Sequence, residues 1–318
     1  MRRLLLTGAV AAATLAFAFR SVGSAPESGP DAVSDGSSPG HVAFPFAASP
    51  DGTAHAPDLA ALIPARIEER PGPPPSFALR VKSPLAQQYC DFDPPPDPGH
   101  AFYFTRGVYS NYRGWGRRGG GSWSVDWPKS DCQFNVVLKR LTNIDSYLEP
   151  NAVALDDPAL LRFPYVYILE VGRIALSPGE ISNLRDFLLK GGFLFVDDFW
   201  GNNEWYPFED AMRQVLPEYP IEPLPLDHEY FHTFYDVDEV HQVPNVNNAR
   251  WGVTSECGGC YAEVYGIFDE KRRLMVVINW NTDLGDAWEW AEQPDYPVRY
   301  STYAFEVGVN AIIYAMSH

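Results

Sequence analysis

Apolar residues form short, dense runs from about residue 101 to the end of the chain, and between residues 20 and 100 they are scattered. The clearest run covers residues 165–169, which are apolar at every position and therefore predict a strand buried on both faces. Residues 101–105, 193–196 and 274–278 have the same character, and 152–155 indicates a further short strand. These runs give a series of separate strands rather than one continuous apolar segment.

Helical periodicity fills the intervals between the strands. Ser177 and Glu180 have capping-box spacing, and Pro178 between them suits the first position of a helix. Two glycines at 191 and 192 end this helix before the next strand. Further helices are predicted at residues 130–141, opened by a second capping box at Ser130 and Gln133, at 208–216 and at 302–316.

Alternating strands and helices over residues 98–318 predict an α/β fold, with a doubly wound, mostly parallel sheet and helices on both faces. In such a sheet the ligand crevice lies beyond the carboxyl ends of the strands. Polar residues follow the predicted strand ends here. The candidate ligand-binding residues are Arg106, Glu170, Asp197, Asp198, Trp200, His228, His232 and Asp286.

Carboxylates and imidazoles together suit a divalent metal as well as acid–base chemistry. The candidate metal ligands are Asp198, His228 and His232. The two histidines share one face only if their segment is helical, whereas Pro223 and Pro225 favour an extended or turn conformation. The alternative for each residue is structural, since an aspartate at a strand end often caps a loop and a loop histidine is often only hydrogen-bonded. Asp197 and Asp198 would point to opposite sides if the strand continued through both.

The first quarter of the chain has a different composition. Residues 1–25 predict a signal peptide or N-terminal anchor, because Arg2 and Arg3 precede an uncharged, mostly apolar stretch at 4–19. That stretch is short for a membrane span, which usually takes about 20 residues. Residues 26–97 are rich in Pro, Gly and Ser and predict a disordered linker. The protein is therefore expected to be exported: periplasmic, cell-surface or secreted.

The net charge of −17 argues against binding to nucleic acid or anionic lipid. Membrane contact is expected only through an uncleaved N-terminal segment. The glycine- and arginine-rich loop at 113–121 superficially resembles RNA-binding segments, but a flexible loop over the crevice mouth is the simpler interpretation. Four cysteines, an even number, fit an oxidising compartment. For Cys257 and Cys260 a structural disulfide or plain thiols lead, with redox chemistry and metal binding as alternatives.

Familiar catalytic motifs do not occur in the sequence context that they require. The only G-x-S-x-G match, at residues 36–40, lies in the predicted linker and not at a strand-to-helix turn, and no phosphate-binding or dinucleotide-binding glycine loop directly follows a predicted strand. Hydrolase or amidotransferase chemistry of the elbow type therefore lacks its nucleophile.

Several segments together resemble the bacterial domain of unknown function 4159. They are residues 126–131, 141–144, 190–198, 227–235 and 285–289, and the resemblance covers about 101–318. It implies a flavodoxin-like layout similar to class I glutamine amidotransferases, without their cysteine nucleophile. The residues that the resemblance marks as a shared site are Arg106, Asp131, Asp197, Asp198, His228, His232 and Asp286.

The leading hypothesis is a non-catalytic module of the cell envelope that binds a polar glycan or peptide-like ligand. It relies on the missing nucleophile and on aromatic residues expected near the crevice, namely Trp200, Trp205, Tyr206, Trp280, Trp288 and Trp290. The alternative is a metal-dependent hydrolase in which Asp198, His228 and His232 hold a divalent ion and Asp286 or Glu289 acts as base on a bound water. This alternative requires those side chains to converge. A purely structural envelope protein is the third possibility.

Overall fold

The computed structural model describes residues 99–112 and 122–318. The predicted signal peptide or anchor at 1–25, the linker at 26–97 and the loop at 113–121 lie outside these residues. Within the described ranges, no helix has the length and apolar character needed to cross a membrane.

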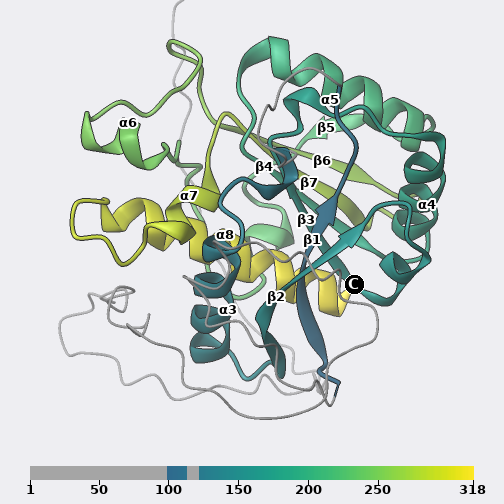
Figure 1. Cartoon of the computed structure of the whole chain (residues 1–318), viewed down its shortest axis with the longest axis horizontal. Helices are drawn as coiled ribbons and strands as arrows, with labels where there is room; N and C mark the ends of the chain where they lie inside the picture. Colours follow the sequence, from purple (N-terminus) through teal and green to yellow (C-terminus); the bar gives the residue numbers. More distant parts are fainter. Residues whose placement is uncertain (1–98, 113–121) are drawn as a thin grey trace, which may run out of the picture. The chain divides into compact units, whose positions relative to one another are not determined.

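The described domain is built on a sheet of seven strands in the order β2-β1-β3-β4-β7-β6-β5 (Figure 1). The strands are β1 Phe102–Val108, β2 Ser146–Ala154, β3 Tyr165–Leu169, β4 Phe193–Asp197, β5 Ile221–Pro223, β6 Glu263–Phe268 and β7 Leu274–Trp280. The first five strands in this order are parallel, whereas β6 pairs antiparallel with β7 and with β5. The predicted α/β fold with a mostly parallel sheet is therefore confirmed.

Helices cover both faces of the sheet (Figure 1). Their bounds are α3 Lys129–Leu141, α4 Pro178–Leu189, α5 Gly201–Val215, α6 Val246–Arg250, α7 Leu284–Glu289 and α8 Val298–Ser317. Short 3-10 turns lie at η1 Ser122–Ser124, η2 Pro158–Arg162, η3 Val171–Arg173 and η4 Glu229–His232. One core layer lies between the sheet and α4 and α5, and the other lies between the sheet and α3, α7 and α8.

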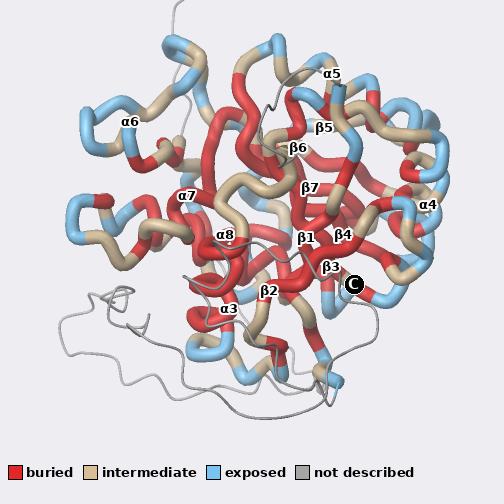
Figure 2. Tube along the Cα trace, viewed as in Figure 1, coloured by how far each residue is buried: buried red, intermediate tan, exposed pale blue. Residues whose placement is uncertain are grey.

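Side chains alternate between the two layers along each central strand, as pleating requires. On β3, Tyr165 and Tyr167 enter the layer of α3, α7 and α8, while Val166 and Ile168 enter the layer of α4 and α5. All five residues of β3 are buried, which explains why the sequence has no polar position there (Figure 2). The runs at 165–169, 193–196 and 274–278 are thus strands buried on both faces, whereas the run at 152–155 is the end of the edge strand β2.

Helix starts were predicted with mixed success. At α4 the capping box is present: the Ser177 Oγ accepts from the Glu180 N–H, and the Glu180 carboxylate accepts from the Ser177 N–H. The capping box predicted at Ser130 is wrong, because α3 begins one residue earlier and has Pro128 at its N-cap. Ser130 is buried and its hydroxyl instead contacts Arg106 and Asp131. Helix α5 also begins earlier than predicted, at Gly201.

Candidate functional site

The strand order reverses direction between β1 and β3. The chain leaves β1 for β2 on one side and then returns to β3 on the other, so the connections diverge at the carboxyl ends of these strands. This is the place where open α/β sheets bind ligands. The chain segments that follow β3, β4 and β7 all bring carboxylates to this carboxyl edge of the sheet, at Glu170, Asp198 and Asp283.

Three carboxylates converge at this edge, and we call them the aspartate cluster: Asp126, Asp283 and Asp286. One carboxylate oxygen of each lies within 4.8 Å of the others. Asp283 is the N-cap of α7, where its Oδ1 accepts from the Asp286 N–H at 2.8 Å. The Asp286 Oδ2 accepts from the N–H of Val246, the first residue of α6. The cluster therefore joins the turn before α3 to the starts of α6 and α7.

Asp126 is the least satisfied member of the aspartate cluster. Its buried Oδ2 has no hydrogen-bond partner among the described residues. Its backbone is left-handed, with φ of 60°. A buried carboxylate oxygen without a partner is costly, and such a group in a native structure calls for an explanation. A cation at the cluster would supply the missing partner.

The electrostatic environment of the aspartate cluster favours either protons or a cation. Burial raises the pKa of Asp126 well above its usual range, and the charges of Asp286 and Glu289 raise it further. Burial also raises the pKa of Asp283, with Asp198, Asp286 and Asp126 adding to it. For Asp286 burial raises the pKa, while the Val246 N–H opposes the shift. Buried like charges this close are not all ionised unless a positive charge neutralises them.

A second group of acids continues from the cluster along the same edge. Asp198 has its pKa raised well above normal by burial, then by Glu170 and Asp126. Glu170 has its pKa raised to about 7 by burial and by the charge of Glu204. The Asp198 Oδ1 accepts from the Trp200 indole N–H at 3.0 Å. Asp198 is thus coupled electrostatically both to Asp126 of the aspartate cluster and to Glu170.

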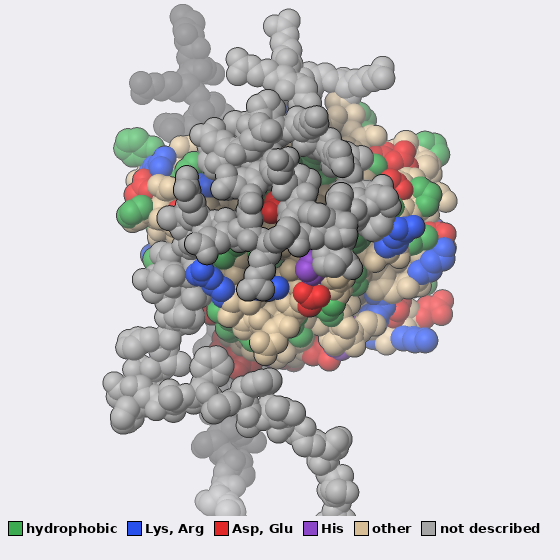
Figure 3. Space-filling model, turned by 60° about the horizontal axis from the view of Figure 1, so that its bottom comes forward, with side chains coloured by type: hydrophobic (Ala, Val, Ile, Leu, Met, Phe, Trp, Pro, Cys, Tyr) green, Lys and Arg blue, Asp and Glu red, His purple; other side chains and the backbone are tan. Residues whose placement is uncertain are grey.

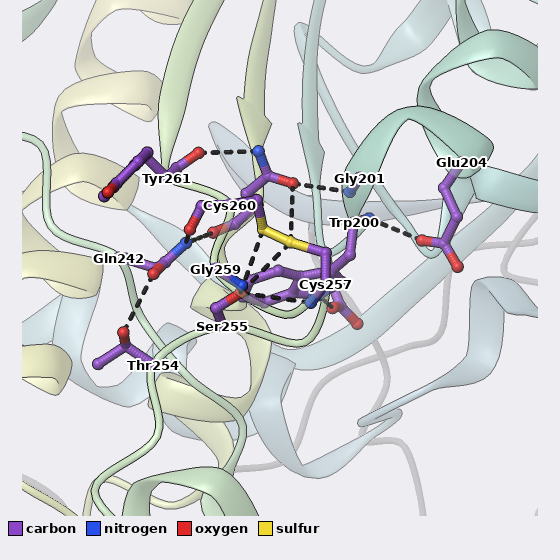
Figure 4. The surroundings of a disulfide bond; sticks show 12 residues. Trp200, Gly201, Glu204, Gln242, Thr254, Ser255, Cys257, Gly259, Cys260 and Tyr261 are labelled. Carbon is purple, nitrogen blue, oxygen red and sulfur yellow. Dashed lines mark hydrogen bonds between the residues drawn. A yellow bond between two sulfur atoms is a disulfide. The ribbon is translucent and has the colours of Figure 1, made fainter. Parts of the chain in front are cut away.

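A disulfide between Cys257 and Cys260 secures the loop that borders these acids (Figure 4). The Ser255 hydroxyl lies 3.3 Å from both sulfurs. Asn281, just after β7, accepts from the Gly201 N–H at 2.7 Å and donates to the Tyr261 carbonyl at 2.8 Å. Within the loop, burial raises the pKa of Glu256, and the charges of Asp286 and Glu204 contribute to the shift. Of the alternatives weighed for the cysteine pair, the structure has the disulfide.

Arg106 does not face the crevice, contrary to its expected role in ligand binding. It is fully buried, and its five N–H groups donate to the carbonyls of Trp123 and Val125, the Ser130 hydroxyl and the Asp131 carboxylate. No N–H of Arg106 is left for a ligand. The physical reason is that a buried guanidinium must be paired and hydrogen-bonded within the protein.

Asp197 is also an interior residue. Strand β4 ends there and Asp198 turns away with φ of 50°, so the strand does not continue through both aspartates. The Asp197 Oδ2 accepts from the N–H groups of Leu284 and Gly285, at 2.9 and 3.0 Å, and from the Tyr167 hydroxyl at 3.2 Å. Asp197 therefore fixes the start of α7, while Asp198 faces the acids.

The structure does not assemble Asp198, His228 and His232 into a metal site. The His228 ring packs on Phe268, which pairs with Leu274 at the start of β7, whereas Asp198 follows the carboxyl end of the neighbouring β4. β7 has seven residues, so its two ends lie roughly 20 Å apart. His232 is bonded to Asp236 and to the Leu226 carbonyl. The segment forms a 3-10 turn, and it packs at the amino edge of the sheet.

The aromatic residues expected near the crevice mostly fill the core. Trp288 is fully buried and contacts Phe134, with ring centroids 4.7 Å apart. Trp205 and Trp280 pack on each other at 4.7 Å, and Trp200 is 8% exposed. Lys129 Nζ covers the Trp290 ring, and of the six only Tyr206 is largely exposed. They do not form one open stacking surface, because their large apolar area is used in packing.

Sequence reasoning did not select Asp126 or Asp283 as site residues. Asp126 precedes α3 and is far from any strand end in sequence, so the strand-end rule could not find it. Asp283 follows β7, and its spacing to Asp286 is that of an N-cap to the third helical residue, a signal for a helix start and not for a ligand site. Their convergence with Asp286 depends on tertiary structure.

Comparison with known proteins gives a family but no activity. No curated protein matches the chain. A family model described as a domain of unknown function (DUF4159) matches residues 111–316, which include the whole aspartate cluster, the disulfide loop and both histidines. Because this match covers more than half of the sequence, the chain belongs to the DUF4159 family.

Proposed function

We propose that the domain binds a divalent cation at the aspartate cluster and uses the ion to hold a polar, oxygen-bearing ligand. The observation that carries this proposal is the convergence of Asp126, Asp283 and Asp286 within 4.8 Å. The unpartnered Oδ2 of Asp126 supports it independently, since that oxygen has an unused acceptor position at the cluster.

The donor set indicates which ions fit. Carboxylate oxygens without imidazole or thiolate suit hard ions such as Mg²⁺, Ca²⁺ and Mn²⁺ better than Zn²⁺. A bound divalent ion would offset the mutual repulsion of the three aspartates and complete the coordination of Asp126. Three protein ligands leave further positions around such an ion for ligand oxygens. Hydroxyl or carbonyl groups of a glycan or peptide-like molecule have the required chemistry.

Export to the cell envelope belongs to the same proposal. The predicted N-terminal signal or anchor would place the domain outside the cytoplasm, where the disulfide of Cys257 and Cys260 would persist. A likeness to class I glutamine amidotransferases would concern the layout of the sheet alone. It carries no activity to this chain, because fold does not determine function.

The test is calorimetric titration of the full chain with Mg²⁺, Ca²⁺, Mn²⁺ and Zn²⁺, for the wild type and for Asp283→Asn. Asparagine keeps the N-cap acceptor for the Asp286 N–H but removes the charge, so helix α7 should persist while affinity falls at least tenfold. Asp157→Asn is a matched control, because Asp157 is likewise an N-cap, of η2, and accepts from the Ala159 N–H at 2.8 Å. Absence of binding in the wild type, or equal affinity in Asp283→Asn, would overturn the proposal.

The polar ligand is tested separately by glycan and peptide binding screens with and without a chelator. Binding that disappears on chelation and returns with the ion is the expected result. Binding that is insensitive to the chelator would remove the ion from ligand recognition.

A second candidate, a cation-dependent hydrolase, is favoured by one specific observation. Burial and the charge of Asp286 raise the pKa of Glu289 to about 7, which suits a general base at neutral pH. In this hypothesis the aspartate cluster, in place of Asp198, His228 and His232, holds the ion, and Glu289 accepts a proton from a water bound to it. Turnover of ester or glycoside substrates that is lost in Glu289→Gln, with cation affinity retained, would distinguish this activity from binding alone.

A further inference from the structure

The aspartate cluster is made from two chain segments that are separated by more than 150 residues. Asp126 lies in the turn that joins η1 to α3, and Asp283 and Asp286 lie at the start of α7. The strands behind the cluster supply no member of it. Each of the two segments is instead attached to the sheet by one buried charged side chain.

Arg106 of β1 holds the first segment. Its Nη1 donates to the carbonyl of Trp123 at 3.2 Å and to the carbonyl of Val125 at 2.6 Å. Both residues lie in the chain segment just before Asp126. Its Nη2 donates to the Ser130 hydroxyl at 2.9 Å and to Asp131, in the first turn of α3. One guanidinium therefore bonds the backbone before Asp126 and two side chains after it.

Asp197 of β4 holds the second segment by accepting backbone N–H groups, whereas Arg106 donates to backbone carbonyls. It accepts the N–H groups of Leu284 and Gly285, which lie between Asp283 and Asp286 in sequence. The carboxylate thus fixes the first turn of α7, and with it the directions of both aspartates. Its Oδ2 makes these bonds and lies on the side of the sheet that α7 covers.

Tyr167 of β3 connects the two holding residues. The Arg106 guanidinium lies over the Tyr167 ring, 4.9 Å from its centroid, and the Tyr167 hydroxyl donates to Asp197 at 3.2 Å. The two segments also meet at Gly285, where a Cβ atom would lie 2.6 Å from the Asp126 Oδ2 and 2.8 Å from the Tyr167 hydroxyl. The spacing between the halves of the cluster is therefore set by a connected group of buried side chains.

We propose that Arg106 and Asp197 are positioning residues of the cation site, acting through Asp126 and through the start of α7 respectively. This inference rests on the proposed cation binding. Neither residue contacts the ion. Residues that orient metal ligands typically change metal affinity by about 10–100-fold when they are replaced.

Arg106 can be tested with a substitution that separates its charge from its hydrogen-bond geometry. Lysine keeps the positive charge but has no planar fork, so it cannot bond two carbonyls and a carboxylate in fixed directions. Arg106→Lys should therefore release the turn that holds Asp126 while keeping a charge for Asp131. Arg273→Lys is the matched control, because Arg273 likewise donates to two carbonyls, of Gly192 and Leu188, and to the Asp269 carboxylate. Arg273 directly precedes β7, so it lies at the opposite edge of the sheet.

The experiment uses Tb³⁺, a hard ion with the oxygen preference of Ca²⁺, bound to the full chain. Its luminescence lifetimes in H₂O and D₂O give the number of coordinated waters. A carboxylate supplies one or two oxygens, so loss of Asp126 from the ion should add about one or two waters. We expect Arg106→Lys and Asp126→Asn to add the same number and to weaken binding about tenfold or more, while Arg273→Lys adds none.

Asp197→Asn tests the second half of the proposal. It should reproduce the change in water count of Asp283→Asn, because both changes act on the start of α7. If Asp197→Asn does not fold, Tyr167→Phe removes only the hydroxyl bond to Asp197 and should give a smaller change in the same direction.

The outcomes separate the two proposals. Wild-type protein that binds no Tb³⁺ would overturn the cation site itself. Stoichiometric binding in the wild type with unchanged water counts in folded Arg106→Lys and Asp197→Asn would overturn only the positioning roles. Equal changes in Arg106→Lys and Arg273→Lys would also overturn them, because the effect would then follow general destabilisation. If Arg106→Lys does not fold, Ser130→Ala can replace it, because it removes one hydrogen bond to the guanidinium. It should also raise the number of coordinated waters, and an unchanged number would overturn the role of Arg106.

Discussion

The two edges of the sheet handle charge in opposite ways. At the amino edge, Arg273 pairs with Asp269 and Arg272 pairs with Glu222, so positive and negative side chains alternate. At the carboxyl edge, Asp126, Asp283 and Asp286 face one another. Interspersed charges of both signs are also visible at the rim of the molecular face in Figure 3. Paired charges contribute to folding or are neutral, whereas buried like charges cost stability.

The cost in stability at the carboxyl edge is the reason to place the proposed cation site there. Structural ion pairs can perturb pKa values, but a buried group of like charges gives the fold nothing in return unless a ligand neutralises it. The amino edge has the composition of a stabilising surface. The carboxyl edge has that of a binding site, at the place where doubly wound folds bind their ligands.

Among the changes at the carboxyl edge, Gly285→Ala should have the largest effect on stability and on cation affinity. The added methyl group would meet the Asp126 Oδ2 and the Tyr167 hydroxyl at less than 3 Å, so the Asp126 carboxylate and the Tyr167 hydroxyl must shift away from α7. We expect a loss of about 1–3 kcal/mol in the free energy of unfolding and about a tenfold loss of cation affinity. Urea unfolding and calorimetry measure the two effects.

Gly179→Ala is the control for this change. Its Cβ would meet no atom closer than 3.6 Å, and Gly179 lies in the first turn of α4. Replacing this glycine should leave cation affinity unchanged and raise stability by about 0.4–1 kcal/mol. Equal behaviour of the two alanine variants would contradict the close packing at Gly285.

Replacing Cys257 and Cys260 by serine tests whether the loop at the carboxyl edge depends on its covalent link. The bond closes a short loop, with a sequence separation of 3, so chain entropy predicts a loss of about 2 kcal/mol. Chemical unfolding without reductant measures this loss. Ser255→Ala, which keeps the disulfide, should have a clearly smaller effect, and a double serine variant as stable as the wild type would show that the loop is held by Gln242 and Asn281 alone.

Glu170→Gln should increase the stability of the carboxyl edge in a way that depends on pH. The folded protein raises the pKa of Glu170 to about 7, above the unfolded value of about 4.5, so this group costs stability progressively as pH rises between those values. Glutamine removes that cost. At pH 8 the variant should be more stable by about 1–2 kcal/mol, less than the full shift implies because part of the side chain remains in water.

At pH 4 the Glu170→Gln variant and the wild type should be nearly equally stable, because the glutamate is then mostly protonated in both folded and unfolded chains. Glu209→Gln is the control, since Glu209 forms a surface pair with Arg213 one helical turn away. It should change stability by less than about 0.5 kcal/mol at either pH. A Glu170 effect that is independent of pH would contradict the raised pKa.

The smallest effect on the site is expected from His228→Ala combined with His232→Ala. Both histidines belong to the amino edge, where His228 accepts from the Tyr230 N–H and His232 contacts Asp236. Cation affinity and metal content of the purified protein should equal those of the wild type. A stoichiometric metal lost in this double variant would place an ion at the amino edge and contradict the distinction between the edges.

The sequence predicted those parts of the fold that local patterns encode. The strand at 165–169 is β3 with the same bounds, and the capping box at Ser177 begins α4 as expected. β5 and β6 were not predicted, since β5 has only three residues, none of them buried, and β6 joins the sheet through its antiparallel pairing with β7, which local pattern does not encode. Ser130 has the local signal of a helix cap, but burial against Arg106 gives it a different role.

The candidate site divides in the same way. The strand-end rule led to the edge where the aspartate cluster lies and included Glu170, Asp198 and Asp286, because the order of strands and helices constrains which ends share an edge. It also selected Arg106 and Asp197, which are fully buried in the core and hydrogen-bonded within the protein. It could not find Asp126, since a turn before a helix has no fixed place in a sheet until the chain is folded.

The sequence alone determined the class of fold, because alternation of apolar residues and helix caps are local properties, and it contained the motifs of the family. Tertiary structure decided which carboxylates converge in the aspartate cluster, which charged groups are buried in the core and which lie at the opposite edge. The physical reason is that the role of a charged side chain depends on the groups that surround it in the folded protein. A guanidinium enclosed by carbonyls becomes part of the core, whereas three carboxylates brought together need a cation or protons, and only packing of distant segments brings them together.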